Sequence, residues 1–371
     1  MKTFFNLIQE VQKPGFCHRC GGCVTFCTAV NYGALKLDEQ GNPGYADIEK
    51  CIECGLCYAI CPEIEELEEE TRRLVSWSAP LGRVFETTVA RAAEPDIRNQ
   101  ATDGGVVTAL LVHLFDSGRI DGAIVTRQVS PYQREPFLAM TREEIINSAG
   151  FHFDTSHGMK DFSDRYLTYS SIEELKPMVT KGLRRVAFVG TPCQIKSIRK
   201  MQAMEIVPSE AIAVCFGLFC SGNFLFGPEQ REFIARVGGF SWDQAVKINV
   251  KDDFMVHLQD GSIVSIKLDE LETIKRVACR YCPDYAAEFA DISFGGLGAE
   301  HGWTTVLTRS PLGRAIFADA RGEAIEEFSW KDNAHFATNA FERILHWSEG
   351  KKRTAQANRQ ELGGSAVQVK A

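Results

Sequence analysis

Cysteine is the residue type that points most directly to chemistry, and eight of the thirteen cysteines lie between Cys17 and Cys61. They form two copies of the spacing Cys-x2-Cys-x2-Cys-x3-Cys, which is the bacterial ferredoxin run. In that run three thiolates hold one 4Fe-4S cluster and the fourth reaches the other cluster. We therefore assign one cluster to Cys17, Cys20, Cys23 and Cys61, and a second cluster to Cys51, Cys54, Cys57 and Cys27.

A pair of zinc knuckles is the alternative, because zinc sites also use Cys-x2-Cys. Four regularly spaced cysteines repeated twice favour the clusters. Thr28 follows the fourth cysteine of the first copy where proline is usual, and Pro62 keeps the usual residue in the second. Paired clusters of this kind conduct electrons, so we expect the chemistry in residues 84–350.

The remaining cysteines fall in three segments that are far apart in the chain. Two of these segments follow predicted strands and can meet at one edge of a sheet. We expect a third 4Fe-4S cluster on Cys193, Cys220, Cys279 and Cys282, with Cys215 as a buried thiol in an apolar strand. A nucleophilic Cys193 with a lowered pKa at a helix start is the alternative.

The overall composition limits the possible partners and the location. The formal net charge of -8 argues against a nucleic-acid binder, which needs a basic surface. The longest apolar runs, 105–114 and 211–219, are shorter than the ~20 residues that span a bilayer. Many cysteines without a signal-peptide pattern favour metal ligation in the cytoplasm, with docking on a membrane complex left open.

Residues from 84 onward alternate between strand-like and helix-like patterns. We expect strands at 84–92, 122–126, 185–189 and 211–219, helices at 104–115 and 194–201, and a meander over 244–266 that turns at Asp260 and Gly261. The fold class is therefore α+β, with a ferredoxin-like two-cluster module before a larger α/β domain that has a mixed sheet.

Three segments follow from these patterns. Residues 1–70 form the 2x(4Fe-4S) ferredoxin domain, 71–350 form the larger domain, and 351–371 form a flexible C-terminal tail because they contain few large apolar groups. The acidic run at 63–73 joins the first two segments, and we expect a short helix with a solvated face there.

Five stretches of the larger domain resemble the coenzyme F420 hydrogenase and dehydrogenase beta-subunit family. They are residues 103–111, 190–194, 217–220, 279–284 and 290–296, within a resemblance that covers roughly residues 80–340. The ferredoxin module is similar to that of F420H2 dehydrogenase input subunits. Where many relatives have Gly-Asp, this chain has Gly295 and Gly296.

The resemblance implies a flavoprotein that binds FAD and a 4Fe-4S cluster in the larger domain and exchanges hydride with coenzyme F420. A flavin also suits the chain physically, because a hydride carrier can meet single-electron clusters only through a two-electron to one-electron converter. No complete Gly-x-Gly-x-x-Gly fingerprint for a nicotinamide cofactor is present.

The FAD-binding residues are expected at three turns. Asp103, Gly104, Gly105 and Thr108 open a helix whose N-H groups favour a pyrophosphate, although these glycines could serve only a tight helix entry. Gly190, Thr191, Pro192 and Gln194 make a strand-to-helix turn. Ser293, Gly295 and Gly296 end a strand, for which a plain loop is the alternative. Cationic candidates for the F420 phosphate and glutamyl tail are Lys196, Arg199, Arg276, Arg280, His152 and His157.

The predicted function is electron transfer from reduced F420 through FAD and three 4Fe-4S clusters to a partner, or the reverse. The resemblance places the partner among hydrogenases, formate dehydrogenases, heterodisulfide reductases and membrane oxidoreductases. The alternatives are a ferredoxin-dependent flavoprotein reductase of another organic substrate, a relay subunit without its own substrate, and a zinc scaffold. The hydride-site residues stay unassigned.

Overall fold

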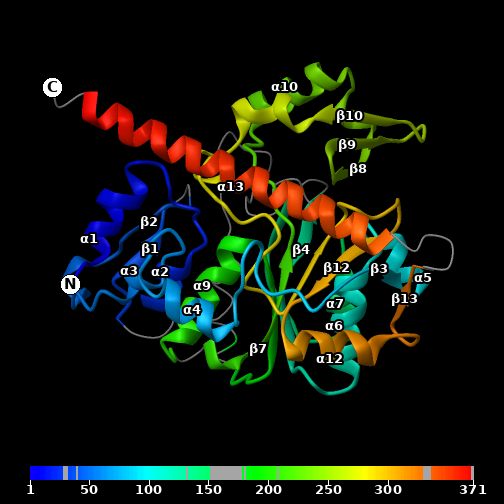
Figure 1. Cartoon of the computed structure of the whole chain (residues 1–371), viewed down its shortest axis with the longest axis horizontal. Helices are drawn as coiled ribbons and strands as arrows, with labels where there is room; N and C mark the ends of the chain where they lie inside the picture. Colours follow the sequence, from blue (N-terminus) through cyan, green and yellow to red (C-terminus); the bar gives the residue numbers. More distant parts are fainter. Residues whose placement is uncertain are drawn as a thin grey trace.

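A computed structural model describes residues 1–27, 32–38, 41–130, 133–150, 178, 181–206, 209–328 and 336–368. Figure 1 shows four parts: a large central sheet with helices packed on it, a small module at the N-terminus, a separate lobe around β8, β9 and β10, and a long C-terminal helix that crosses the molecule. The predicted fold class, a ferredoxin-like module followed by a larger domain with a mixed sheet, is confirmed.

The large sheet has eight strands in the order β13-β3-β12-β11-β7-β6-β4-β5. Their bounds are β3 Glu86–Ala92, β4 Gly122–Ser130, β5 Gln133–Ala139, β6 Val186–Gly190, β7 Ile212–Leu218, β11 Ile292–Gly295, β12 Thr304–Thr308 and β13 Ile325–Glu327. The pairs β11–β7, β7–β6 and β6–β4 are parallel and the other pairs are antiparallel. The carboxyl ends of four strands, β11, β7, β6 and β4, therefore meet at one edge.

Helices cover the sheet because each presents an apolar stripe to it. In α6, Val106–Asp116, seven of eleven side chains are buried, and α9, Pro192–Ala203, packs on β6 and β7. The predicted strands and the helices at 104–115 and 194–201 are thus confirmed within two residues at each end, except that the strand predicted at 122–126 continues to Ser130. The other helices of this domain are α5 Pro95–Gln100, α7 Arg142–Asn147, α11 Val277–Arg280 and α12 Pro311–Ala320.

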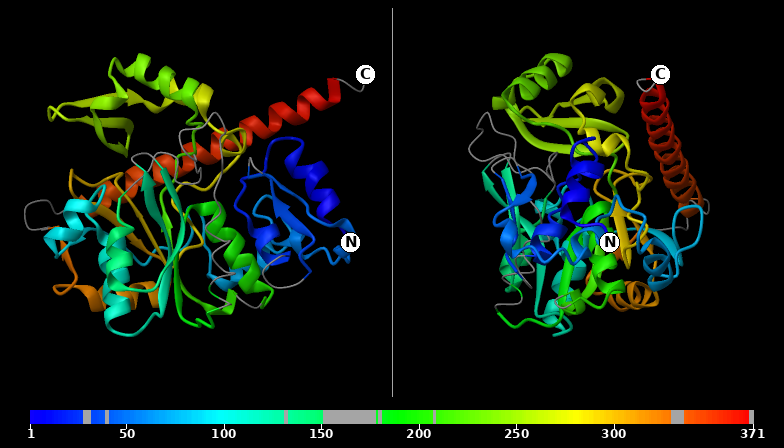
Figure 2. Two further views of the ribbon diagram at one scale, coloured as in Figure 1. Left: turned by 180° about the vertical axis from the view of Figure 1, so that it is seen from behind. Right: turned by 90° about the vertical axis from the view of Figure 1, so that its left-hand side faces the viewer.

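The predicted meander forms a three-stranded antiparallel sheet of its own. It contains β8 Ala245–Val250, β9 Asp253–Leu258 and β10 Ile263–Lys267, and it packs against α10, Pro228–Gly238. The two elements share a separate core that includes Phe226, Ile234 and Phe254. This lobe stands beside the large sheet at its carboxyl edge (Figures 1 and 2).

The N-terminal module contains α1 Phe4–Leu7, α2 Gly22–Thr25, α3 Leu56–Ala59, β1 Leu35–Leu37 and β2 Pro43–Tyr45. Its two cysteine runs share one backbone feature. Gly21 and Gly55 stand two residues before the third cysteine of each run, and both have a positive φ, of 80° and 75°. Glycine adopts this conformation without the steric cost of a side chain. Each short helix then starts at the next residue.

The expectation about the terminal segment is wrong, and the expectation of a solvated face in the connecting run fails at Glu63. Residues 351–368 are not a flexible tail, because α13 runs from Phe336 to Gln368 without interruption. Its side chains bond to the rest of the protein as far along as Arg359, which holds it in place. The acidic run does form a short helix, α4 Glu68–Leu74, but Glu63 at its start is buried.

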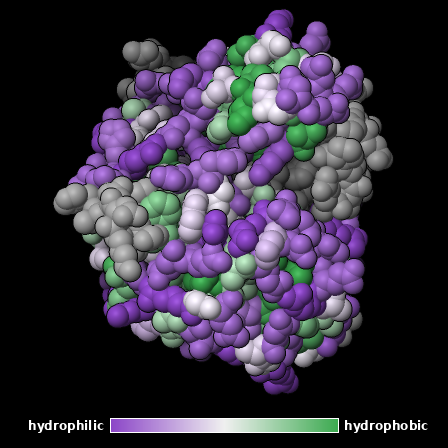
Figure 3. Space-filling view, turned by 90° about the vertical axis from the view of Figure 1, so that its right-hand side faces the viewer, coloured by the Kyte–Doolittle hydropathy of each residue, from purple (hydrophilic) through white to green (hydrophobic). Residues whose placement is uncertain are grey.

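No helix among the described residues is both long enough and apolar enough to cross a bilayer. Figure 3 shows one face of the molecule, on which hydrophilic residues predominate and hydrophobic residues form small separate areas.

Candidate functional site

A large cavity lies where the carboxyl ends of the parallel strands meet the β8–β10 lobe. Val125, Val189, Leu218 and Gly295 line it from β4, β6, β7 and β11, and Asn249 lines it from β8. It leaves about 1340 Å³ free of protein atoms, part of it open to solvent. Ligands of open α/β sheets bind in this position, outside the carboxyl ends of parallel strands. A cavity lined by so many elements can hold an organic molecule rather than a single ion.

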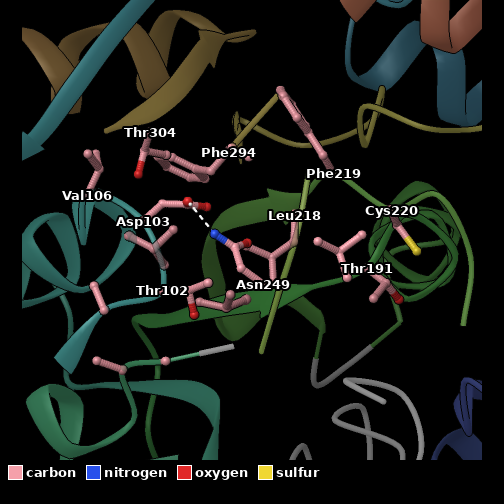
Figure 4. Close-up of a pocket in the computed structure, with 18 of the residues that line it drawn as sticks. Thr102, Asp103, Val106, Thr191, Leu218, Phe219, Cys220, Asn249, Phe294 and Thr304 are labelled. Carbon is pink, nitrogen blue, oxygen red and sulfur yellow. Dashed lines mark hydrogen bonds between the residues drawn. The ribbon is translucent and has the colours of Figure 1, made fainter. Parts of the chain in front are cut away.

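Six of the eleven expected FAD-binding residues line this cavity, and they come from all three predicted turns. The six are Asp103, Gly105, Thr108, Thr191, Gly295 and Gly296. Figure 4 shows Thr102, Asp103 and Val106 at one end of the cavity, and Thr191 and Cys220 together at the other. The tertiary structure therefore brings the three turns to one place, although they are separated by about 190 residues of chain.

Five expected residues do not line the cavity, and their contacts are local. A Cβ on Gly104 would lie 2.7 Å from the Ala90 carbonyl oxygen, and a Cβ on Gly190 would lie 2.6 Å from the Phe188 ring, so both glycines permit close packing. Ser293 is buried and donates a hydrogen bond to the Ala287 carbonyl at 3.1 Å.

Pro192 and Gln194 shape the start of α9. Pro192 occupies the first turn, where its missing N-H costs nothing. The Gln194 amide oxygen accepts a hydrogen bond from the Thr191 backbone N-H at 3.0 Å, which completes a capping box. These two residues fix the direction of α9 and the position of Thr191 at the cavity.

Asp103 connects the entry of α6 to the β8–β10 lobe. Its Oδ1 accepts a hydrogen bond from Asn249 Nδ2 at 3.1 Å, drawn in Figure 4, and lies 3.4 Å from Lys251 Nζ. Lys247 Nζ donates to the neighbouring carbonyls of Ala101 and Thr102 at 3.1 and 2.7 Å. Polar groups from both sides thus meet at this end of the cavity and hold the lobe over it.

Gly296 has no room for a side chain. A Cβ there would lie 2.8 Å from Asp103 Oδ2 and 2.9 Å from Lys251 Cε. A side chain at this position would therefore displace the ends of the Asp103 or Lys251 side chains. In this chain the Asp103 carboxylate reaches that space from the opposite wall.

Of the four cysteines expected to hold a third cluster, one lines the cavity and another lies within electrostatic range of the ferredoxin module. Cys220 lines the cavity wall. Burial raises the pKa of Cys193, and the charges of Cys20 and Cys282 raise it further, which places Cys193 within electrostatic range of both. A raised pKa is the opposite of what an activated nucleophile needs. Cys215 is fully buried in β7, as expected.

The ferredoxin cysteines gather in two groups. The pKa of Cys23 is raised by burial and then by the charges of Cys20, Cys17 and Cys61. The pKa of Cys57 is raised to about 12 by burial and then by Cys54, Cys27 and Cys51. Cys57 of the second group is also within electrostatic range of Cys23, so the two groups lie close to each other.

Among the described residues, no three His, Cys, Asp or Glu side chains converge closely enough to hold a single metal ion. The thiolates of a 4Fe-4S cluster each bind a different iron, and so they need a wider arrangement than one ion requires.

The ferredoxin module is fastened to the larger domain by buried polar contacts. Arg276 donates to the carbonyls of Cys17 and His18 at 3.1 and 3.0 Å. Lys200, which is fully buried on α9, donates to the carbonyls of Cys61 and Glu66 at 2.8 and 2.9 Å, and also to those of Ala59 and Ile64. These contacts fix the first cluster's loops against α9 and α11.

Glu63 belongs to the same interface, which explains why it is not solvated. It accepts from His18 at 2.6 Å and from Arg359 of α13 at 2.6 Å. Burial raises the pKa of Glu63, but His18 and Arg359 outweigh burial and hold it at about 2. A buried carboxylate is tolerated when cations pair with it in this way.

None of the expected cationic anchors that the structure describes lines the cavity. Lys196 pairs with Glu68, Arg199 pairs with Asp291, and Arg280 donates to the Glu272 carbonyl, while Arg276 bonds to the ferredoxin loops. His152 and His157 lie outside the described residues. Lys251 lines the cavity instead, and the sequence offered no signal for it beyond its place in the meander.

Comparisons with known proteins agree with this architecture. Residues 87–161 and 183–332 match the N-terminal and C-terminal parts of the coenzyme F420 hydrogenase/dehydrogenase beta subunit, and residues 9–62 match a 4Fe-4S dicluster domain. A coenzyme F420 hydrogenase beta subunit of Methanosarcina barkeri is 32% identical over 67% of this chain and 82% of its own length. The chain belongs to the coenzyme F420 hydrogenase/dehydrogenase beta-subunit family. It is therefore an oxidoreductase with a 4Fe-4S module.

Two further relatives extend the match. The beta subunit of the Methanothermobacter thermautotrophicus enzyme is 30% identical over 76% of this chain and 98% of its own length. One component of the F(420)H(2) dehydrogenase of Methanosarcina mazei is 25% identical and covers 85% of both chains, so it matches more of this chain. In a solved F420-reducing NiFe hydrogenase complex from M. barkeri, a chain 27% identical superposes with a TM-score of 0.66, over 77% of this chain and 94% of that chain.

Proposed function

We propose that this chain exchanges hydride with coenzyme F420 at a bound FAD and passes single electrons through three 4Fe-4S clusters to a partner oxidoreductase. The observation that carries the proposal is the position of Cys220, which lines the cavity and belongs to the expected third cluster. One wall of the cavity would therefore hold both redox groups. When bound, FAD would supply the conversion between two-electron and one-electron transfer.

The residues of the cavity fit a dinucleotide. Gly105 and Thr108 present the first turn of α6, whose free N-H groups and dipole favour a phosphate group. Val106, Leu218 and Phe294 provide apolar walls for a ring system. The hydrogen bond between Asp103 and Asn249 ties the lobe to the entry of α6 beside the cavity.

The cysteines fit a chain of clusters. Cys193 and Cys220 would bind the third cluster from the ends of β6 and β7, and Cys279 and Cys282 would bind it from α11 and the loop after it. Because Cys193 is within electrostatic range of Cys20, the first cluster would come next, followed by the second. The partner would be a hydrogenase, a formate dehydrogenase, a heterodisulfide reductase or a membrane oxidoreductase, by analogy with the relatives.

The test is anaerobic purification followed by assays of iron, FAD and donor oxidation. We expect about twelve irons and one FAD per chain, since three cubanes and one flavin require them. Reduced F420, but not NADH, should reduce a viologen dye. If neither donor is oxidised by fully loaded protein, the F420 assignment is wrong and a relay subunit or another reductase is favoured.

A matched pair of variants tests the third cluster itself. Cys220→Ala should lose about four irons per chain, because a cubane holds four. Cys215→Ala changes a buried thiol within β7, the strand that leads to Cys220, and should keep the native iron content. Equal iron in the two variants would remove the third cluster from the proposal.

A further inference from the structure

Lys351 lies in the buried stripe of α13. Ala340, Ile344, Ser348 and Ala355 are at most 2% exposed and follow one another at helical spacing. Lys351 falls between Ser348 and Ala355 on the same face. An ammonium on a packed face costs free energy unless negative charge compensates for it.

The direct partners of Lys351 are neutral. Its Nζ donates to the backbone carbonyls of Cys220, at 2.5 Å, and of Asp284, at 2.8 Å. Within the described part of the chain, no carboxylate lies at ion-pair distance from Lys351, whereas the next residue, Lys352, pairs with Glu288 at 2.5 Å. The charge that compensates Lys351 therefore comes from groups that are not in direct contact with its ammonium.

The two carbonyls identify those groups. Cys220 is an expected ligand of the third cluster, and Asp284 stands two residues after another, Cys282, whose Sγ lies 3.7 Å from the Asp284 carbonyl oxygen. Burial lowers the pKa of Lys351, but the charges of Cys282, Cys220 and Cys279, followed by that of the Asp284 carboxylate, together outweigh burial and raise it. Lys351 thus stands among three of the four expected ligands.

We propose that the ammonium of Lys351 is the built-in counter-charge of the third cluster and raises its reduction potential. The inference rests on the proposed third cluster. A cubane with four thiolates becomes more negative by one charge when it takes up one electron, and no bond forms or breaks. A fixed positive charge stabilises the reduced state more than the oxidised state, since attraction grows with the charge of the cluster.

The rest of α13 positions this charge. Arg343 bonds to Asp252 in the loop between β8 and β9 at 2.7 Å, and Arg359 bonds to Glu63 of the ferredoxin module. Trp347 packs on Tyr285 of the cavity wall, with ring centroids 5.8 Å apart. Figure 1 shows the helix crossing from the large sheet to the ferredoxin module. The helix therefore holds Lys351 between two fixed ends.

The experiment compares Lys351→Gln with Lys351→Arg in the holoprotein. Glutamine keeps a donor for the carbonyls but removes the charge, and arginine keeps the charge. Samples are poised with mediators at the midpoint of the native third cluster, whose paramagnetic signal is isolated by subtracting the spectrum of Cys220→Ala. We expect the ratio of reduced to oxidised cluster to fall about tenfold in Lys351→Gln, which is 59 mV for one electron.

Lys351→Arg, and Lys352→Gln as the neighbouring charge control, should both stay within about threefold of the native ratio. A native ratio in Lys351→Gln with full iron content would overturn the inference while leaving the third cluster intact. If Lys351→Gln loses four irons while Lys351→Arg keeps them and has the native ratio of reduced to oxidised cluster, the inference that the cluster needs a positive charge at this position stands. Loss of the cluster in both Lys351 variants would mean that the shape of the lysine side chain matters rather than its charge, and would overturn the inference. Cys220→Ala with undiminished iron would instead refute the proposed cluster.

Discussion

Gly22 of the first cluster loop packs directly on Ser197 of α9, and this contact can be perturbed from both sides. A Cβ on Gly22 would lie 2.3 Å from Ser197 Oγ but 3.5 Å from Ser197 Cβ. Gly22→Ala therefore creates a clash with the hydroxyl oxygen alone. Ser197→Ala removes that oxygen, so the double variant should fit where the single variant does not.

The magnitude follows from these distances. Overpacking a well-packed interface costs about 1–3 kcal/mol. Ser197 Oγ donates a long bond, at 3.4 Å, to the Ile60 carbonyl and also contacts the Cys20 thiol, so Ser197→Ala should cost about 1 kcal/mol. The stability of the double variant should lie within about 1 kcal/mol of the stability of Ser197→Ala. The two substitutions then have a coupling free energy of about 1–2 kcal/mol in favour of the pair.

Hydrogen exchange measures this coupling locally. The amides of 17–27 and of α9 report the free energy of opening at the interface, and 1.4 kcal/mol corresponds to a tenfold change in exchange rate. We expect about 5- to 150-fold faster exchange in Gly22→Ala and near-native exchange in the double variant. If the double variant exchanges as fast as Gly22→Ala, the ferredoxin loop is not seated on Ser197 and the docking described above is wrong.

Two further predictions concern the α6 entry and the first cluster loop. Hydrogen exchange should show that α6 opens about tenfold more often in Gly105→Ala than in Gly118→Ala. Both positions have a positive φ, of 77° and 66°. Only a Cβ at Gly105 would meet side chains, at 3.1 and 3.2 Å. Equal exchange rates in the two variants would mean that backbone strain alone, and not the contact with side chains, destabilises α6. Arg276→Gln removes charged hydrogen bonds to the carbonyls of Cys17 and His18, each worth about 1.5–3 kcal/mol. This variant should therefore release iron to a chelator at least tenfold faster than the native protein. Native release would show that these bonds do not hold the loop.

The sequence alone determined the features that depend on local spacing. Two cysteine runs predict two clusters because the thiolates of a cubane must come from a tight loop and the following helix. The strand 212–218 is a continuous apolar run, and such runs suit strands buried on both faces. The predicted turns at 103–105, 190–194 and 293–296 contribute residues to one cavity, because strands of one sheet bring their ends together.

Only the tertiary structure decided which residues of those turns reach the cavity. Gly104 is packed against Ala90 and Thr304 of neighbouring strands, whereas Gly190 and Ser293 have their contacts with residues nearby in the chain. The sequence also placed Glu63 on a solvated face and residue 351 in a flexible tail. Composition cannot show that His18 and Arg359 pair with Glu63, or that the polar end of α13 lies against the cysteine loops. Buried charges depend on partners far away in the chain, and folding alone brings those partners together.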